Sequence, residues 1–332
     1  MSADEVFQNR IQEFRRIRIE HPRLLGIRKE INQLRSEARR SVGQEQWVLP
    51  IIGPSQSGKS LALDHYCETV IANENHPKGH IPLLSVRISN GSSLKQLQAD
   101  ILAPLLVDEN GEVDEDELQD PKTQVQFRRK VRQYGKKRAC EVIALDEAQH
   151  LITRNRGKTA IAVAESIKLM AIEGAAAFIV IGVRDTWQIF QANNKQLLLR
   201  SRPPIFLNPL DFERPHEAEL FAGYVAMLDS KLVEHGITSE LSGFAEGDMI
   251  ASFWEVSGGV VGIVSRLVQL AWEYASALGL SIVPPKFLEA ATDNWAVALG
   301  IARSNPFRDG PRSVRIVKEE LDCKDRATGG PK

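Results

Sequence analysis

The chain has 332 residues, of which 43% are hydrophobic and 26% are charged. This length predicts two domains, or one large α/β domain with extensions, and the apolar content excludes global disorder. The formal net charge of −1 excludes a protein that is basic throughout. Three widely spaced cysteines argue against a disulfide framework and a zinc ribbon. A polar start and the lack of a long apolar run predict a cytoplasmic protein with no membrane partner.

Residues 1–45 have the pattern of a basic helical extension. Phe7, Ile11 and Phe14 recur at helical spacing, while arginines fill the other face. A second helical pattern over Leu24–Ala38 follows the break at Pro22. Two interpretations stay open, namely helices packed on the next domain or a basic arm that contacts nucleic acid or a partner protein.

Residues 46–210 alternate short apolar runs with amphipathic stretches, which predicts a parallel sheet with crossover helices. The predicted strands are Trp47–Ile52, Leu83–Ile88, Val142–Leu145, Ala177–Ile181 and Pro204–Leu207. Pro50 is unexpected in the first of them, because proline removes a donor from the hydrogen-bonded ladder. An acidic stretch over residues 108–120 predicts a solvated loop, and the basic stretch over residues 122–138 predicts a helix.

Residues 211–304 lose the strand pattern and predict a small all-α domain. Its predicted helices are His216–Glu234, Asp248–Val256, Gly262–Leu278 and Pro285–Ala298. Residues 305–332 are rich in proline, glycine and mixed charge, so a partner-binding tail with little regular structure is expected there.

One loop carries the strongest functional signal, because residues 53–60 (GPSQSGKS) fit the pattern GxxxxGK[ST] without a gap. Its glycines let successive N–H groups point at phosphate oxygens, and the following helix presents its positive end to the same anion. Lys59 is expected to reach the β- and γ-phosphates, and the Ser60 hydroxyl to bind Mg²⁺. The predicted ATP-binding residues are Gly53, Pro54, Ser55, Gln56, Ser57, Gly58, Lys59, Ser60 and Leu61.

A second acidic element follows the apolar run Val142–Leu145, where Asp146 and Glu147 are adjacent. Asp146 suits the Mg²⁺ site with Ser60, and Glu147 suits the general base that polarises the attacking water. His150 is interpreted as a hydrogen-bonded residue at a helix start. The pair of carboxylates predicts an ATPase that works as a switch, and it argues against a small-molecule phosphotransferase, which only the loop would support.

The order of the segments GPSQSGKS, VIALDEAQHL, FIVIGVRDTWQIFQAN, LLLRSRPPIFLNPL and SGGVVGIVSRL resembles the TniB/TnsC family of AAA+ transposition regulators, including those of CRISPR-associated transposons. The resemblance implies an α/β fold, a P-loop AAA+ three-layer domain with a central parallel sheet, followed by the small all-α lid domain. It also implies an ATP-bound ring or filament of this chain on duplex DNA. That assembly links a target-selection protein to the transposase subunits and is taken apart with hydrolysis. A helicase-loader-like or replication-initiator AAA+ ATPase is the alternative, since it has the same core and lid.

The resemblance also implies sites that depend on arginines. A finger arginine should lie just before the fifth strand, where Arg200 is preferred to Arg202 because of its distance from the strand end. It would stabilise charge on a neighbouring subunit's nucleotide. A polar residue usually ends the fourth strand in AAA+ proteins, but Gly182 stands here and Arg184 is a poor substitute. Arg266 is the candidate for the second sensor, in contact with the nucleotide.

Two basic patches are candidates for duplex DNA. They lie in the stretch of residues 122–138 and in the loop after Glu147. The predicted DNA contacts are Arg128, Arg129, Lys130, Arg132, Arg154, Arg156 and Lys158. Because aromatic residues are not interleaved, phosphate contact with little sequence preference is expected, with a solvated surface as the alternative for either patch.

Overall fold

The structure is a computed structural model that describes residues 3–108, 111–113, 121, 123–152, 158–191 and 195–327. It divides into two compact units, of which one is formed by residues 23–207. The other combines residues 1–22 with residues 208–332.

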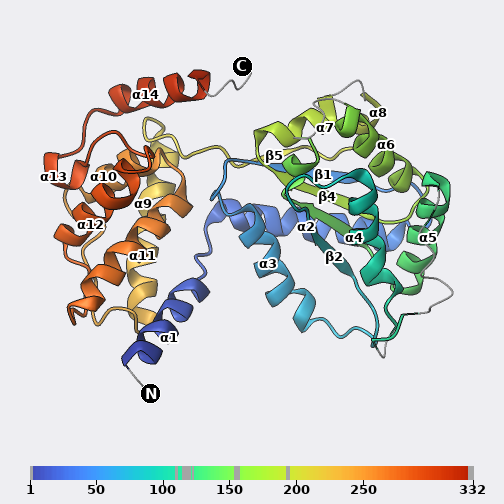
Figure 1. The fold of residues 1–332 in the computed structure, drawn as a ribbon, viewed down its shortest axis with the longest axis horizontal. Coiled ribbons are helices and arrows are strands. Elements are labelled where there is room, and N and C mark those ends of the chain that lie inside the picture. The colour runs from blue at the N-terminus through green and yellow to red at the C-terminus, as the bar shows by residue number, and fades with distance from the viewer. Residues whose placement is uncertain are drawn as a thin grey trace. The chain divides into compact units, whose positions relative to one another are not determined.

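A five-stranded parallel sheet forms the centre of the unit of residues 23–207 (Figure 1). Its strands are β1 (Val48–Ile52), β2 (Leu83–Arg87), β3 (Val142–Asp146), β4 (Ala177–Gly182) and β5 (Ile205–Phe206). The order across the sheet is β2-β3-β4-β1-β5, so β4 separates β1 from β3. The carboxyl ends of parallel strands meet at one edge, where ligands bind in open α/β sheets. The segments after β1 and β3, which carry the predicted ATP site, therefore share an edge.

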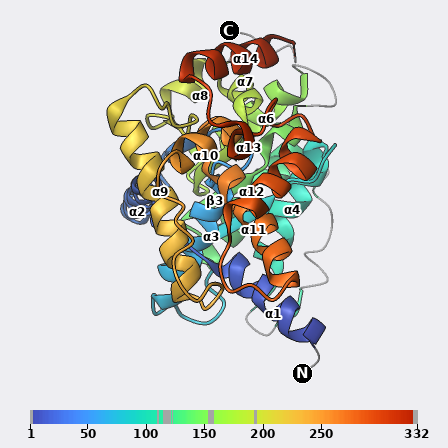
Figure 2. The same cartoon turned by 90° about the vertical axis from the view of Figure 1, so that its left-hand side faces the viewer.

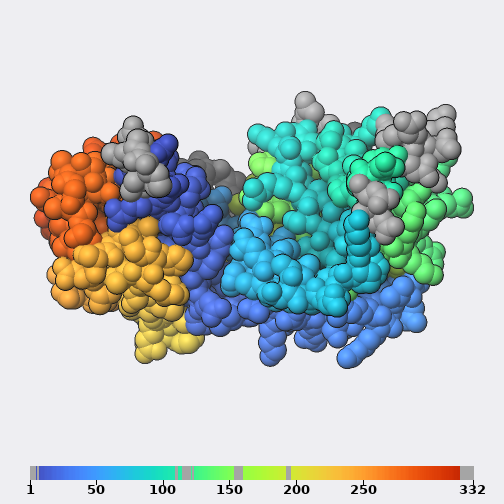
Figure 3. All heavy atoms as spheres, turned by 90° about the horizontal axis from the view of Figure 1, so that it is seen from below, coloured from blue at the N-terminus to red at the C-terminus, as the bar shows by residue number. Residues whose placement is uncertain are grey.

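Helices cover both faces of this sheet. On one face lie α2 (Pro22–Arg40) and α3 (Lys59–Thr69), the side that Figure 3 shows in blue and light blue. The other face is covered by α4 (Leu94–Leu106), α5 (Gln124–Lys137) and α6 (Lys158–Ile172). An apolar core lies on each face of the sheet. Successive strand residues alternate between these two cores, because successive side chains point to opposite faces. The three-layer α/β arrangement is thus confirmed.

Short elements complete this unit. They are η1 (Ile71–Asn73), η3 (Ala148–Leu151), η4 (Arg184–Trp187), α7 (Gln188–Gln191) and α8 (Lys195–Leu199). Several of them follow strand ends, so they shape the edge of the sheet that carries the site.

Pro50 lies in the middle of β1 without breaking the sheet. Val48, two residues before Pro50, exchanges backbone hydrogen bonds with the segment before β5. Ile52, two residues after Pro50, pairs with β5 itself. Alternate residues of a strand bond to the same side, so the nitrogen of Pro50 faces the β5 side. The chain opposite it there is Pro203 and Pro204, which lie outside the paired residues of β5. The missing N–H therefore removes no bond from the β1–β4 ladder.

The second unit is all-helical (Figures 1 and 2). Its helices are α1 (Ala3–Arg16), α9 (Pro215–Glu234), α10 (Met249–Ser257), α11 (Val261–Ala277), α12 (Pro285–Ala291), the π-helical turn η5 (Thr292–Val297), α13 (Pro306–Asp309) and α14 (Val314–Ala327). Within the described residues, no single helix is long and apolar enough to cross a membrane. The pair α10 and α11, bent by 112°, passes that test only together.

The two N-terminal helices belong to different units, which differs from the predicted extension of residues 1–45. On α1, Phe7 and Phe14 pack against the Trp272 indole at centroid distances of 5.8 Å and 5.9 Å, and Arg10 lies over the same ring. In contrast, α2 packs on the sheet through Ile31 and its neighbours. Both helices bury their apolar face, and the boundary between the two units falls at Pro22. Contact of this segment with nucleic acid or a partner protein remains a prediction.

The C-terminal segment is helical, whereas little regular structure was expected from residue 305 onward. Lys318 on α14 forms ion pairs with Asp211 and Glu213, and Val317 is buried in the helical core. Before α14, Arg312 binds the buried carboxylate of Glu255 at 2.7 Å. The mixed charge of this segment is therefore used in specific ion pairs.

Candidate functional site

The loop of residues 53–60 joins β1 to α3 in a conformation that depends on its glycines. A Cβ atom at Gly53 would lie 2.8 Å from the backbone oxygen of Leu207, so the chain has no room for a side chain there. Gly58 precedes α3 with φ +88, and no side chain caps the first turn of that helix. The N–H groups of this turn are therefore available to an anion, and the helix dipole favours negative charge at the same place.

Lys59 is buried inside this loop. Its ammonium group donates to the carbonyl oxygens of Gly53 at 2.9 Å and Pro54 at 2.6 Å, and to the Ser57 hydroxyl at 3.3 Å. Burial lowers the pKa of Lys59, because an apolar environment disfavours the charged form. The negative charges of Glu147 and Asp146 raise the pKa of Lys59 and so counteract part of that effect.

The second acidic element ends β3 at the same edge of the sheet. Asp146 is the last residue of β3 and is 4% exposed, and its Oδ1 accepts the backbone N–H of Glu147 at 2.9 Å. Glu147 has φ +59, a left-handed conformation that is uncommon for residues other than glycine. The hydrogen bond from its N–H holds this backbone, so Glu147 turns out of the strand direction while Asp146 stays in it.

Two neighbours of these carboxylates were not assigned from the sequence. The Arg87 guanidinium at the end of β2 lies 3.7 Å from Asp146, opposite it in the strand register. Gln149 donates its amide to Glu147 and accepts from the Val183 backbone at the end of β4. The position of Arg87 near Asp146 could be predicted from the sequence, because both residues end predicted neighbouring strands. The sequence carries no signal for the contacts of Gln149.

The residues present fit a magnesium ion that is shared with a nucleotide. The Asp146 carboxylate and the Ser60 hydroxyl, the second residue of α3, are hard oxygen donors of the kind that Mg²⁺ prefers. Within the described residues, no group of three or more His, Cys, Asp or Glu could hold a metal by itself. Mg²⁺ at such sites is completed by phosphate oxygens and water, so one carboxylate and one hydroxyl are sufficient.

The two candidate finger arginines lie where β1 begins, at the amino ends of the strands, opposite the carboxyl ends that carry the loop of residues 53–60. The backbone of Arg200 and Arg202 bonds to Val48 at the start of β1, whereas the ATP loop follows its end. Arg200 pairs with Glu45 at 2.5 Å and is partly exposed, while Arg202 is 12% exposed and engaged by carboxylates on α2. Both arginines therefore lie away from the loop of residues 53–60 of their own chain, and the finger role of either remains a prediction.

Within the described residues, no hydrogen bond or ion pair joins Arg266, the predicted second sensor, or Arg184 to the loop of residues 53–60. Arg184 begins η4 directly after β4. Arg266 lies on α11 in the helical unit, where it donates to Gln269 at 3.1 Å. Its role as a second sensor remains a prediction.

The predicted DNA contacts separate into three groups. Arg129 and Arg132 are exposed on α5, and Lys130 is partly exposed there. Arg128 is different, since it is 12% exposed and forms an ion pair with Glu173 at 2.9 Å, so its charge is used within the fold. Arg154 and Arg156 lie outside the described residues, and Lys158 is placed only as the first residue of α6.

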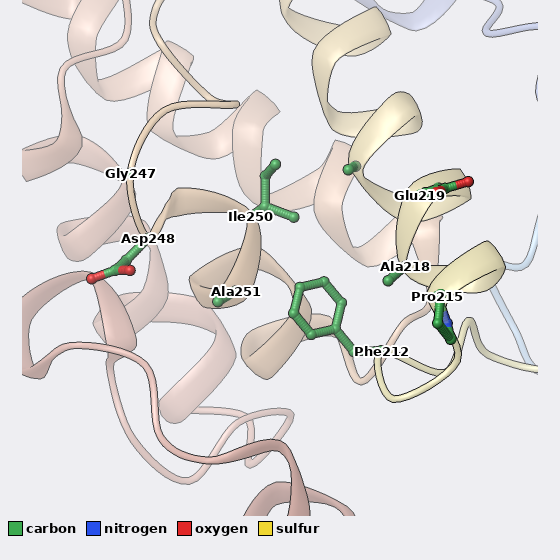
Figure 4. Close-up of a pocket in the computed structure, with 9 residues that line it drawn as sticks. Phe212, Pro215, Ala218, Glu219, Gly247, Asp248, Ile250 and Ala251 are labelled. Carbon is green, nitrogen blue, oxygen red and sulfur yellow. The ribbon is translucent and has the colours of Figure 1, made fainter.

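The helical unit has a groove of about 530 Å³ between α9 and α10, shown in Figure 4. Phe212 and Ile250 line it, with Glu219 and Asp248 at its rim. Phe212 also stacks on Trp254 at a centroid distance of 5.5 Å, so this wall is fixed. Its two carboxylates, Glu219 and Asp248, have no basic or nucleophilic side chain beside them in the lining, and the candidate active site remains at the carboxyl ends of the strands.

Comparison with protein families agrees with this geometry. The family model of the AAA domain matches residues 42–190, which include the ATP loop and the second acidic element. No curated protein matches the chain by sequence.

Solved structures share the fold of the AAA domain and of the helical region that follows it. Cdc6p of Pyrobaculum aerophilum matches with a TM-score of 0.57 at 11% identity, covering 93% of this chain and 86% of that chain. The ORC2 protein of Aeropyrum pernix, solved as ADPNP–ADP complexes, matches with a TM-score of 0.52 at 13% identity, over 81% of this chain and 67% of that one. The chain therefore has the fold of AAA+ P-loop ATPases with a helical C-terminal region.

The ORC1 protein of Aeropyrum pernix, solved in complex with DNA, also matches, with a TM-score of 0.51 at 11% identity. The match covers 80% of this chain but 64% of ORC1, so the chain spans less than two thirds of that protein.

Proposed function

We propose that the protein is a cytoplasmic ATP-dependent regulator of DNA transposition. It assembles on target duplex DNA, links a target-selection protein to transposase subunits, and leaves the DNA when ATP is hydrolysed. The observation that carries the ATPase part is the sheet topology, which places Lys59, after β1, and Asp146 and Glu147, after β3, at the carboxyl ends of parallel strands. The transposition part rests on the resemblance of the motif segments to the TniB/TnsC family.

ATP binding begins at the loop of residues 53–60. The free N–H groups at the start of α3 receive the phosphates, and Lys59 exchanges its bonds to Gly53 and Pro54 for phosphate oxygens. Asp146 and Ser60 would hold Mg²⁺, which supplies charge neutralisation of the phosphates when bound. The loop carbonyls keep the ammonium group in place before the nucleotide arrives, so little reorganisation of the side chain is needed.

Hydrolysis then depends on Glu147. Its carboxylate accepts a proton from a water whose oxygen attacks the γ-phosphorus, while the bond from that phosphorus to the β–γ bridging oxygen breaks. The products are ADP and phosphate, and the proton stays on Glu147 until solvent removes it. Glu147 is suited to this role because its side chain is 38% exposed and can reach water, whereas Asp146 is buried.

Arg200 of a neighbouring copy would complete the site. It lies at the opposite edge of the sheet from its own ATP loop, and a positive charge supplied by a neighbour stabilises the phosphoryl-transfer transition state. Hydrolysis would then require assembly. This connects the nucleotide cycle to the formation of a ring or filament on DNA.

A second candidate is a helicase-loader-like or replication-initiator ATPase. The likeness in fold to Cdc6p, which covers 93% of this chain, favours it because it includes the helical unit as well as the AAA domain. Both candidates share the ATP site and DNA binding. They differ in the partner, which is a replicative helicase in one case and a transposase in the other.

The test combines two variants of the full chain. Lys59→Ala should lose ATP binding, with Lys29→Ala on the surface of α2 as the matched control. Glu147→Gln should bind ATP normally and remain assembled on duplex DNA, with the exposed Glu240→Gln as its control. Binding is measured with a fluorescent ATP analogue, hydrolysis by phosphate release, and assembly by negative-stain imaging with linear duplex DNA.

Particles that stay monomeric with ATP and duplex DNA would contradict the assembly model. Pull-down with purified partners decides between the two candidates. Retention of a transposase subunit in the presence of ATP supports the transposition regulator, and retention of a replicative helicase alone supports the second candidate.

A further inference from the structure

The end of β4 has an unusual arrangement beside the proposed catalytic carboxylate. Gly182 is the last residue of β4, and a Cβ atom built there would overlap the Thr186 hydroxyl and lie 2.6 Å from Oε1 of Gln149. The position therefore accepts no side chain because polar groups from η3 and η4 already fill the space.

Gln149 connects this strand end to Glu147. Its Oε1 accepts the backbone N–H of Val183 at 3.2 Å, and its Nε2 donates to Oε2 of Glu147. The orientation of the amide is set by its partners, since a backbone N–H can only donate and an ionised carboxylate can only accept. One side chain thus bridges the strand beside β1 and the proposed general base.

The bridge acts on a carboxylate whose backbone is already fixed. The N–H of Glu147 donates to Asp146 at 2.9 Å in the left-handed conformation, so only side-chain rotation remains free. Gln149 holds one carboxylate oxygen, which removes most of that freedom. Thr186, fully buried beside Gly182, has a hydroxyl without a hydrogen-bond partner among the described residues. This hydroxyl and the Gln149 amide lie against the same strand end at Gly182.

We propose that Gln149 is a positioning residue for ATP hydrolysis that orients Glu147 toward the attacking water. The inference rests on the proposed ATPase function. Gln149 does not exchange protons itself, and its contribution is to hold the Glu147 carboxylate in one orientation through a bond that is anchored on Val183.

The experiment uses two variants of similar size in the full chain. Gln149→Met keeps the volume and removes both hydrogen bonds, and Gln149→Glu keeps the shape but replaces the donor by a second carboxylate that repels Glu147. Both should lower kcat for ATP about tenfold to a hundredfold, since misplacement of a catalytic group by about 1 Å costs that much. The Kd for a fluorescent ATP analogue should change less than twofold, because the phosphate-binding loop is untouched.

Gln149→Asn separates orientation from simple packing, since the shorter amide cannot span Val183 and Glu147 together and should resemble Gln149→Met. Gln12→Ala on the exposed surface of α1 is the matched control and should retain the wild-type kcat. Thermal unfolding of each variant, with a midpoint close to that of the wild type, shows that the fold is kept.

Two results would overturn the inference. A kcat for Gln149→Met and Gln149→Glu within twofold of the wild type, measured while Glu147→Gln is inactive, would show that Glu147 needs no such support. An increase in kcat would show that Gln149 restrains Glu147 instead of orienting it. If the wild type and Glu147→Gln release phosphate at the same rate, the proposed ATPase function fails instead, so the two failures are distinguishable.

Discussion

The guanidinium of Arg202 is held by the carboxylate of Glu37, with Nη1 at 2.9 Å from one oxygen and 2.8 Å from the other. Glu30, on the same face of the helix about two turns earlier, accepts from the same guanidinium at 2.9 Å. Both glutamates lie on α2, whereas Arg202 lies just before β5. The ion pairs therefore fasten α2 to the edge of the sheet, and Arg202 is engaged within its own chain.

This relationship predicts that substitution of Arg202 affects stability, whereas substitution of Arg200 affects ATP hydrolysis. Arg202→Ala should lower the free energy of unfolding by about 1–3 kcal/mol, because it removes hydrogen bonds between charged groups and leaves two carboxylates side by side. Arg200→Ala should leave stability nearly unchanged and reduce DNA-stimulated ATP hydrolysis by at least about 10³-fold, the effect of a finger arginine. Denaturant titration and phosphate release measure the two quantities. The assignment of Arg200 fails if Arg200→Ala hydrolyses ATP at the wild-type rate.

Lys59 leads to a prediction about pH. Burial lowers its pKa below the ordinary 10.5, and ATP binding needs the charged form. ATP affinity should therefore be constant at neutral pH and decline as the pH rises through this lowered pKa. A guanidinium stays charged, so Lys59→Arg should show no such decline, even if it binds more weakly. Titration with a fluorescent ATP analogue at several pH values provides the measurement. An affinity for the wild type that does not fall in the alkaline range would mean that Lys59 does not titrate there.

The central sheet could be predicted from the sequence because a parallel strand that is buried on both faces is an uninterrupted apolar run. The ATP loop could be predicted because its glycines and Lys59 are local requirements of phosphate binding. The segment of residues 142–147 combines an apolar run typical of a buried strand with two adjacent carboxylates typical of a hydrolytic site. These features depend on short stretches of chain, which is why their positions agree with the structure.

Other features depend on long-range pairing that no local pattern reveals. The division of the N-terminal helices at Pro22 follows from Trp272, which lies more than 200 residues further along the chain and packs against Phe7. The ion pair that engages Arg128 within the fold needs Glu173, which lies in the turn after α6. Gln149 acquires its partner at Val183 only when β3 and β4 align.

The exposed face of α5 should determine how binding to duplex DNA depends on salt. The double variant Arg129→Ala/Arg132→Ala should weaken binding to unrelated DNA sequences to a similar extent. It should reduce the slope of log affinity against log salt by about 1–2, since each phosphate contact contributes about 0.9. Fluorescence anisotropy at several salt concentrations measures the slope. The neutral Gln133→Ala on the same helix is the control, and an unchanged slope in the double variant would exclude α5 from the DNA interface.

The buried Arg35 on α2 predicts a change in acid stability. Its guanidinium is 2% exposed and binds Glu74 at 2.9 Å and Glu141 at 2.8 Å, with the Tyr66 hydroxyl as a third acceptor. The hydrogen bond from Arg35 lowers the pKa of Glu74 below its ordinary 4.5. A lowered folded-state pKa stabilises the fold fully above pH 4.5, and this contribution is lost as the pH falls through the folded pKa.

Arg35→Met should therefore have two effects. At neutral pH it should cost about 3–5 kcal/mol, the expected cost of breaking a buried ion pair by removing one partner. The cost should then shrink as the pH falls below the ordinary pKa of Glu74, because protonated Glu74 no longer gains from Arg35. Denaturant titration of the wild type and Arg35→Met along a pH series measures the difference between their free energies of unfolding. Carboxylates remote from α2 titrate equally in both proteins, so their contribution cancels in this difference. A difference that stays constant down to acid unfolding would show that Arg35 stabilises the sheet through packing and not through its charge.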